Sequence, residues 1–540
     1  MAAARPAMLF KAISLSSAEI EVALQGVTSL ASSPDHQVRV SLNGQVLGYV
    51  IFDGRQRSVE RFSIPHSSLV EGQNTVTLGA QGGSGDISLV DYVRVNYHHT
   101  YRAEQNALWM TVAAGAQAQT VSGFTSPLIR VFDVTDPNSV TEIHGVIDAG
   151  ETDYAITVGV QGAGTRTLLA LTDDQIAHPV SITANQASSL GQTSNGADLI
   201  IITRSDLAPS LEPLKTLRQS QRLSVMVVDI EDVYDEFSFG NKRPQAVKDF
   251  LAYAKANWKK KPRFVLLAAD GSFDPRNYLG AGDTDIVPAK LIDTVFMEAA
   301  SDDWYVDFND DGLPDIALGR LPVRTAEEAA LMVRKIIGYE SSSPSEEMLL
   351  VCDRNDGFNF EQASLDLKPL VPTNLRVNEV YRTRLDDATA KHNLLEAINR
   401  GQKIINYAGH GSVDVWRDDL LNLADAHDLT NGEHLSVFVM MNCLNGYYQD
   451  VAVDSLAESL MKSEKGGAVA VWASSTMTYP FEQSLMNREL YSHVLTGRLT
   501  LGEAVGRAKA ATVDQDIRRS WILFGDPCIC FLSRSRSEAV

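Results

Sequence analysis

Two glycine-flanked loops of the sequence carry side chains that can do acyl-transfer chemistry. His410 follows the apolar run Lys403–Tyr407, and Cys443 follows the apolar run Ser436–Met441. A thiolate attacks carbonyl carbons readily, and an imidazole within hydrogen-bond reach can take the thiol proton. Because the reactive groups of open α/β sheets gather beyond the carboxyl ends of the strands, we expect His410 and Cys443 to meet in one cleft.

Ionisation of the thiol accounts for only part of the rate that such a site needs. A free thiol with a pKa of ~8.5 is a few per cent ionised at pH 7, so full ionisation gains at most ~30-fold. Positioning and an oxyanion hole must supply the rest, and the backbone N–H groups of Gly411 and Cys443 could form that hole. The alternative is a purely structural role for both residues, with Cys443 as a small buried residue and His410 as a hydrogen-bonded loop residue. His427 and His434 compete for the role of base, but neither ends a strand.

Apolar strands that alternate with amphipathic helices must position these loops. After the Ser-, Asn- and Gly-rich linker Asn185–Gly196, apolar runs alternate with helical patterns such as Gln245–Trp258, which Pro244 opens. This pattern predicts an α/β domain, a mainly parallel sheet flanked by helices on both faces. The predicted strands are Asp198–Thr203, Leu223–Ile230, Arg263–Ala269, Met348–Cys352, Lys403–Tyr407, Ser436–Met441 and Ala468–Ala473.

The residues before the linker are typical of β structure. Short alternating runs separated by turn residues, with Asn43-Gly44 as a hairpin signal, predict an antiparallel sandwich. A second β-rich stretch follows it. We therefore expect a jelly-roll-like β-sandwich over 1–104, a second β-rich module over 105–190, the α/β domain over 197–533 and a tail over 534–540.

Composition excludes some classes of function. The formal net charge of −21 disfavours a nucleic-acid partner, whose binding surface would be basic. No run reaches the ~18 apolar residues of a membrane span. The four cysteines are too few for a disulfide scaffold. The chemistry itself requires no cofactor.

One acidic loop resembles part of a calcium site. Oxygen-bearing side chains alternate along it, with Gly312 at the sixth position, as in the first half of an EF-hand loop. The twelfth position is Leu318 rather than Glu, so the loop is not an EF-hand. A structural Ca²⁺ site and a plain acidic turn both remain open. The candidate ligands are Asp307, Asn309, Asp311 and Asp315.

Several ordered motifs resemble the gingipain family of cysteine peptidases. The resemblance covers about Ala197–Leu532 and implies a caspase-like fold, an endopeptidase acting on proteins or peptides, and a dyad of His410 and Cys443. It also implies an extracellular or cell-surface location, although the start of the chain has too short an apolar core for a signal peptide. The motifs are Asn406–Ser412, Met441–Gly446, Leu266–Ser272 with Asp274-Pro275, Ser301–Tyr305, Gly319–Val323 and Phe524–Pro527.

The resemblance also implies where substrate specificity lies. In the family, the segment after the strand that follows the catalytic cysteine walls the substrate pocket. Asp353 and Asp356 follow another strand and would select a basic P1 side chain if they form the pocket floor; a solvated acidic turn is the alternative. The pocket candidates are Asp353, Asp356, Trp416, Ser474, Ser475, Met477 and Thr478.

Two other functions remain open at this stage. One is a transpeptidase, or sortase, of a bacterial secretion system, in which an amine replaces water on the same fold. The other is a non-catalytic surface adhesion or carbohydrate-binding protein. The first β module resembles the jelly-roll-like domain before the catalytic domain of some family members, and such sandwiches bind glycans or act as pro-regions.

Overall fold

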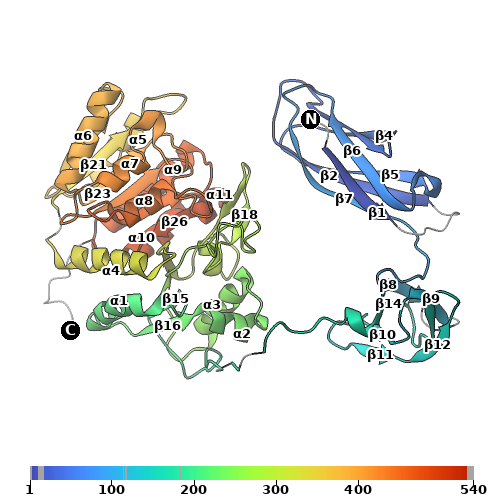
Figure 1. Ribbon diagram of the computed structural model, residues 1–540. Coiled ribbons are helices and arrows are strands. Elements are labelled where there is room, and N and C mark those ends of the chain that lie inside the picture. Colours follow the sequence, from blue (N-terminus) through green and yellow to red (C-terminus); the bar gives the residue numbers. More distant parts are fainter. Residues whose placement is uncertain are drawn as a thin grey trace. The chain divides into compact units, whose positions relative to one another are not determined.

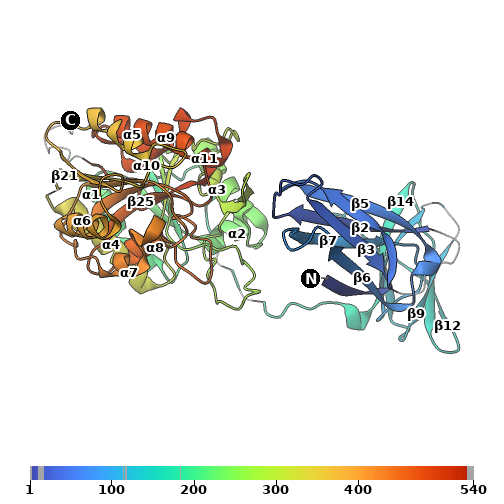
Figure 2. The same ribbon diagram turned by 90° about the horizontal axis from the view of Figure 1, so that it is seen from above.

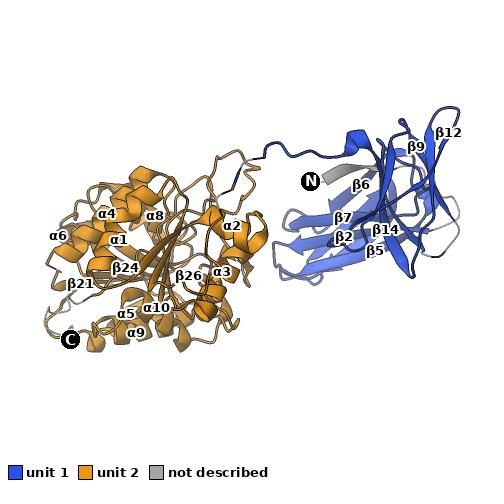
Figure 3. Ribbon diagram, turned by 90° about the horizontal axis from the view of Figure 1, so that it is seen from below, with its two compact units in different colours: residues 1–184 blue, residues 185–540 orange. Residues whose placement is uncertain are grey.

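A computed structural model describes residues 3–9, 17–113, 115, 118–182, 184–185, 187–343 and 345–531. The chain divides into two compact units, Met1–Ala184 and Asn185–Val540 (Figure 3). The predicted tail 534–540 lies outside the described residues. In the described ranges, none of the helices has the length and apolar composition of a membrane span.

The first part of unit 1 is a pair of antiparallel sheets. One sheet has the order β1-β6-β3-β4 and the other the order β5-β2-β7. Alternate residues of the strands, such as Val22 of β2 and Val40 of β3, are fully buried in one apolar cluster. Asn43 and Gly44 both have positive φ, as a tight hairpin between β3 and β4 requires. The strands are β1 (Ala3–Leu9), β2 (Ser17–Gly26), β3 (His36–Leu42), β4 (Gln45–Phe52), β5 (Arg57–Pro65), β6 (Gly72–Ala80) and β7 (Ser88–Asn96).

The second part of unit 1 has its own sheets and its own core. Its sheets have the orders β11-β10-β14-β8 and β12-β13-β9. Val121, Val131 and Leu168 belong to a buried cluster that shares no residue with the first one. The strands are β8 (Ala107–Ala113), β9 (Gln119–Phe124), β10 (Ile129–Asp133), β11 (Thr141–Ile143), β12 (Gly145–Ala149), β13 (Tyr154–Val158) and β14 (Thr165–Thr172).

Unit 2 is built on a ten-stranded mixed sheet of order β16-β15-β17-β20-β26-β25-β24-β23-β21-β22. The neighbours are parallel except at one junction, where β25 and β26 run antiparallel. The sequence predicts a mainly parallel sheet but not this reversal. A small hairpin, β18 (Leu291–Asp293) with β19 (Glu298–Ala300), stands outside the sheet. The sheet strands are β15 (Leu199–Thr203), β16 (Val225–Asp229), β17 (Phe264–Leu267), β20 (Ala317–Arg320), β21 (Glu347–Cys352), β22 (Arg376–Tyr381), β23 (Ile404–Ala408), β24 (Ser436–Met441), β25 (Ala468–Ser474) and β26 (Trp521–Phe524).

Helices cover both faces of this sheet (Figures 1 and 2). Helices α4, α6, α7 and α8 lie on one face, and α5, α9 and α10 lie on the other. Pro244 occupies the first turn of α3, as the sequence predicts. The Thr325 side chain caps α4 by accepting a hydrogen bond from the Glu328 amide. The helices are α1 (Ala208–Ser220), α2 (Ile230–Ser238), α3 (Pro244–Asn257), α4 (Ala326–Ser341), α5 (Phe360–Leu365), α6 (Asp387–Arg400), α7 (Leu423–Asp428), α8 (Leu456–Lys462), α9 (Pro480–Val494), α10 (Leu501–Ala508) and α11 (Gln515–Ser520).

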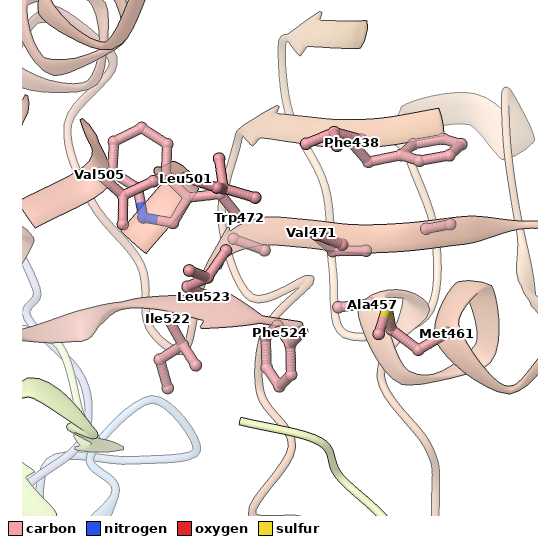
Figure 4. Packing of buried hydrophobic residues seen from close by; sticks show 14 of the residues in the cluster. Phe438, Ala457, Met461, Val471, Trp472, Leu501, Val505, Ile522, Leu523 and Phe524 are labelled. Carbon is pink, nitrogen blue, oxygen red and sulfur yellow. The ribbon is translucent and has the colours of Figure 1, made fainter. Parts of the chain in front are cut away.

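The central strands are buried on both faces. Every residue of β24, β25 and β26 is buried. Phe438, Trp472 and Leu523 come from three adjacent strands and belong to one apolar cluster (Figure 4). Ala457 and Met461 of α8 pack against the same strands. This packing makes the ends of β24 and β25 rigid supports for the loops that follow them.

A buried ion pair ties the long segment after β17 to the sheet. The guanidinium of Arg320, fully buried at the end of β20, donates to both carboxylate oxygens of Asp302 at 2.7 Å. It also donates to the carbonyl oxygen of Ala269 at 2.8 Å. Asp302 accepts a further hydrogen bond from the Tyr448 hydroxyl at 2.8 Å, in the loop after β24. The network therefore links the two halves of the sheet.

Replacing Arg320 with leucine should lower the free energy of unfolding of unit 2 by about 3–5 kcal/mol, because Asp302 is left as a buried charge without its main partner. Urea unfolding followed by tryptophan fluorescence measures this, since Trp109 is the one tryptophan of the sequence outside unit 2. The matched control is Arg263→Leu, whose guanidinium is 59% exposed beside Glu503 and should cost at most about 1 kcal/mol. Equal losses in the two variants would contradict this account.

Candidate active site

Strand register brings the two predicted loops together. β23 and β24 are parallel neighbours, and Ala408 is paired with Met441. His410 and Cys443 each lie two residues beyond this pair. The Gly409 amide donates to the Met441 carbonyl oxygen at 3.2 Å, which extends the pairing past the strand ends. Since paired strands are ~4.8 Å apart, the loops that carry the imidazole and the thiol start side by side.

The backbone of His410 is held from three directions. Its amide donates to the Asp353 carboxylate at 3.3 Å, and its carbonyl oxygen accepts from the Tyr407 hydroxyl at 2.7 Å and the Arg417 amide at 3.0 Å. Asp353 is itself fully buried and accepts a hydrogen bond from the Arg382 guanidinium at 2.6 Å. The turn that presents the imidazole is therefore fixed by a buried charge pair.

The imidazole ring of His410 is oriented by two neighbours. Its Nε2 lies 3.1 Å from Asp356 Oδ1, and the Phe360 ring meets it edge-on at 5.3 Å between centroids. Partial burial alone would raise the pKa of Asp356, but hydrogen bonds from Arg417 and His410 outweigh burial and lower it. An ionised Asp356 can only accept a hydrogen bond, so Nε2 of His410 carries the proton of the neutral imidazole. Nδ1 is then the nitrogen that can accept a proton.

The loop of Cys443 is pinned to the end of β25. Leu444 has a φ of 65°, a conformation that a leucine rarely adopts. Its amide donates to the Thr476 carbonyl oxygen at 3.2 Å, and the Gly446 amide donates to the Ser474 carbonyl oxygen at 2.8 Å. These bonds hold the strained turn and place the half-buried thiol at the tip of β24.

Burial disfavours the ionised form of the Cys443 thiol. Its Sγ contacts the Thr478 carbonyl oxygen at 3.7 Å, and burial raises the pKa of the thiol. Within the described ranges, no hydrogen bond joins Sγ to His410. The protein thus positions the thiol, while burial works against its ionisation.

In the described part of the chain, two backbone amides of these loops lack a hydrogen-bond acceptor. Gly411 and Trp416 lie opposite each other in an antiparallel bridge. The hydrogen bonds of this bridge are made by the residues on either side of them, so the N–H of Gly411 points away from Trp416. Among the residues that the structure describes, neither the Gly411 nor the Cys443 amide has a hydrogen-bond acceptor. A Cβ at Gly411 would lie 1.9 Å from Asn442 Nδ2, so only glycine allows the two loops to pack this closely.

Residues that sequence reasoning missed tie the loops to each other. The Asn445 side chain donates to the Ser412 carbonyl oxygen of the His410 loop and accepts from the Asn442 side chain. Both asparagines are fully buried. They belong to the motif around Cys443, but nothing in their spacing indicates that Asn445 contacts the His410 loop. Arg382, which pairs with Asp353, follows β22, and no motif in the sequence around it indicates this contact.

The structure separates the predicted pocket residues into two groups. Asp353 and Trp416 are fully buried. The Asp353 carboxylate accepts a hydrogen bond from the Arg382 guanidinium, and the Trp416 ring stacks on the Tyr407 ring with centroids 4.0 Å apart. Neither is available to a substrate side chain. Ser474 and Ser475 are also fully buried, and their hydroxyls donate to carbonyl oxygens of the protein.

Met477, Thr478 and Asp356 remain near the two loops. The Thr478 carbonyl oxygen contacts the thiol, and Met477 is half-buried beside it in the chain. Asp356 lies on His410 and also pairs with the Arg417 guanidinium. The structure therefore places Asp356 with the imidazole rather than beneath a substrate.

The acidic loop predicted to bind calcium satisfies its own oxygens. Asp307 accepts the amides of Asp311 at 3.1 Å and Gly312 at 2.8 Å, and Asp315 accepts the amide of Phe308 at 2.9 Å. In the described part of the chain, no group of three or more His, Cys, Asp or Glu side chains could hold a metal ion. The arrangement does not fit a preformed cation cage, and calcium at Asp307, Asn309, Asp311 and Asp315 stays a prediction from the sequence.

Comparison with known proteins decides the family. The model of peptidase family C25 matches residues 192–531, which contain both loops. The chain belongs to peptidase family C25. The gingipain-type resemblance seen in its motifs is confirmed.

Relatives of this C25 peptidase include gingipains of Porphyromonas gingivalis. Gingipain R2 is 23% identical over 278 residues, which are 46% of this chain and 36% of that protein. Gingipain R1 is also 23% identical over 278 residues, 46% of this chain and 27% of that protein. The chain thus spans about a third of the length of the curated relatives it matches.

Solved structures share the fold. The Arg-specific cysteine proteinase gingipain R aligns with a TM-score of 0.53 and 20% identity over 64% of this chain and 80% of that one. The dimeric latent PorU of Porphyromonas gingivalis aligns with a TM-score of 0.58 and 19% identity over 98% of this chain and 49% of that one. The second alignment includes the β modules of unit 1 as well as the peptidase unit.

The raised pKa of the Cys443 thiol predicts a specific pH dependence. Because burial raises the pKa of Cys443, its alkylation by iodoacetamide should accelerate ~10-fold per pH unit up to at least pH 8.5 in the free protein. Mass spectrometry assigns the label, since Cys352 and Cys528 are buried and Cys530 is half-buried. His410→Ala should leave the profile unchanged. A rate that levels off below pH 7 would show instead that an imidazolium holds a thiolate before substrate binds.

Proposed function

We propose that this C25 peptidase hydrolyses peptide bonds with Cys443 as the nucleophile and His410 as the general base and acid. The observation that carries the proposal is the register of β23 and β24, which sets the two loops beside each other. Each loop also has one amide, at Gly411 or Cys443, with no acceptor among the described residues. Nε2 of the imidazole is hydrogen-bonded to Asp356, so Nδ1 is available to take the thiol proton. These are the parts that acyl transfer requires.

The first half of the reaction forms a thioester. The substrate carbonyl oxygen faces the amides of Gly411 and Cys443, while Nδ1 of His410 takes the thiol proton and Sγ bonds to the carbonyl carbon. The C–N bond of the tetrahedral intermediate then breaks. The leaving amine takes the proton from His410, and the acyl group stays on Sγ as a thioester.

The second half returns the enzyme to its starting state. His410 removes a proton from water, the hydroxide attacks the thioester carbonyl carbon, and the C–S bond breaks. Sγ regains the proton, and the product is a carboxylic acid. Asp356 acts as a positioning residue, because it stabilises the imidazolium that forms in each half without touching the substrate.

A basic P1 preference is not part of this proposal. Such a preference requires a free carboxylate beside the thiol. Asp353 is paired with Arg382, and Asp356 is shared between His410 and Arg417. Neither carboxylate is left for an arginine or lysine of a substrate.

Three further elements of the proposal rest on the family resemblance. They are a caspase-like description of unit 2, an extracellular or cell-surface location, and a glycan or cell-surface partner for the first β module. Transfer of the acyl group to an amine is the alternative to hydrolysis, because the same thioester serves both reactions.

Cys443→Ala and His410→Ala should each lower kcat/KM for a peptide substrate by at least ~10³-fold, because each removes a group that no other residue replaces. Melting temperatures should stay within about 2 °C of the parent, since neither change empties a core position. Cys530→Ala, the other half-buried cysteine, is the control and should stay active.

The same assay separates hydrolysis from transfer. With glycinamide added, mass spectrometry should show mainly the carboxylic acid product. If the peptide joined to glycinamide were the main product, the proposed function would be transpeptidation rather than hydrolysis. Full activity of Cys443→Ala would contradict both reactions.

A further inference from the structure

A cavity of about 490 Å³ lies in unit 1, between the connector that follows β7 and strand β8. Residues 97–101, 104 and 107–111 line it. Sites for small ligands have volumes of ~300–1,000 Å³, so the cavity is large enough for one. The residues of the proposed peptidase reaction all belong to unit 2, and that reaction therefore does not account for the cavity.

A tight turn joins the two sides of this cavity. The Glu104 amide donates to the Ala107 carbonyl oxygen at 3.1 Å, and the Ala107 amide donates to the Glu104 carbonyl oxygen at 3.0 Å. Both residues between them have positive φ, as a two-residue hairpin turn requires. On the other side of Glu104 the connector pairs with β9 instead of β8, because the Ala103 amide donates to the Ser122 carbonyl oxygen at 2.7 Å. β8 is an edge strand of its sheet, and its outer edge borders the cavity.

The apolar surface of the cavity is mainly aromatic. Side chains of β8 alternate, so that Met110 is buried in the core of the second part of unit 1 while Trp109 is 64% exposed. Leu108 also packs against that core. Tyr101 donates its hydroxyl to the Thr111 carbonyl oxygen at 2.9 Å, which fixes its ring at the edge of β8. The rings of Trp109 and Tyr101 therefore offer flat surfaces to a ligand, whereas the aliphatic side chains pack on the core.

A pair of polar side chains lies in the same cavity. His99 Nε2 lies 2.9 Å from Glu104 Oε1, and both side chains are partly exposed, at 22% and 33%. The Tyr97 ring meets the His99 ring edge-on at 6.1 Å between centroids, which orients the imidazole. Among the described residues that line the cavity, none is a lysine or an arginine, Glu104 is the only acid, and His98 is a second, exposed imidazole. Because His99 engages the one carboxylate, this lining favours a neutral ligand with hydroxyl groups over a charged one.

We propose that this cavity binds a neutral pyranose sugar, whose ring packs on Trp109 and whose hydroxyl groups bond to His99 and Glu104. A pyranose has an apolar C–H face that matches an aromatic ring, and hydroxyl groups at its rim that donate to a carboxylate and accept from an imidazole N–H. An apolar ligand would instead cover the polar pair without replacing its hydrogen bonds to water, which costs free energy. Sugar binding here does not depend on the proposed peptidase reaction. It places a glycan at β8, in the second part of unit 1, rather than on the first β module.

Fluorine NMR of the full chain labelled with 5-fluorotryptophan tests this directly. The chain has six tryptophans, of which Trp109 is the one in unit 1, and Trp109→Phe assigns its signal. The protein carries Cys443→Ala, so that the result does not depend on hydrolysis. The probes are the methyl glycosides of glucose, galactose, mannose and N-acetylglucosamine. We expect at least one of them to shift the Trp109 signal to saturation and to leave the other tryptophan signals unchanged.

Side-chain variants test the two parts of the site, with saturation-transfer NMR of the glycoside as the measure of affinity. Trp109→Ala should lower the affinity at least ~10-fold because it removes the aromatic surface, and Trp109→Phe, which keeps a ring, should retain more of it. Glu104→Gln keeps the shape of the side chain but removes the carboxylate, and should lower the affinity ~10-fold. The matched control is Tyr49→Ala, which removes another exposed aromatic of unit 1, on β4, and should leave the affinity unchanged.

Three outcomes would overturn sugar binding at β8 while Cys443-dependent hydrolysis stands. They are a Trp109 signal that none of the glycosides shifts, a signal that a neutral dipeptide amide shifts instead, and an affinity that Trp109→Ala leaves unchanged. In the last case, loss of binding in Tyr49→Ala would place the sugar on the first β module. A linear oligosaccharide that binds more tightly than its methyl glycoside would identify a glycan chain as the ligand, and equal affinities would identify a single sugar unit.

Discussion

The pairing of Ala408 with Met441 is the constraint on which the rest of the site depends. In a parallel pair, a one-residue shift turns every side chain to the other face and would separate the two loops that follow. Both strands are buried on both faces, so a shift would also pack each side chain against the wrong layer of helices. The stability of the core and the geometry of the site therefore depend on the same register.

Buried polar groups convert that register into a fixed arrangement of side chains. Asp353 and Arg382 form a buried pair that holds the His410 amide, and Asn442 with Asn445 joins the two loops. Such groups are costly to bury unless they are paired, so they favour one arrangement of the loops over others. Among the residues that the structure describes, the amides of Gly411 and Cys443 have no acceptor, unlike the His410 amide.

The sequence predicted the parts of this site that are local. The apolar runs ending before Ala408 and Asn442, the glycines around His410 and the cysteine at a strand end are all visible in the residue order. The roles of Asp353 and Asp356 were not visible. Whether a carboxylate faces a substrate or an arginine depends on residues such as Arg382 and Arg417, which tertiary packing brings near from other connections. The antiparallel junction of β25 and β26 escaped prediction for the same reason, since strand order is set by the whole sheet.

The central claim is that Cys443 attacks a carbonyl group whose oxygen is held by the amides of Gly411 and Cys443. A crystal structure of the protein with a peptide aldehyde tests it most directly. We predict a thiohemiacetal on Cys443 Sγ, with its oxygen 2.7–3.1 Å from both amides and Nδ1 of His410 facing the sulfur. An adduct on another cysteine, or an oxygen that points away from both amides, would contradict the account.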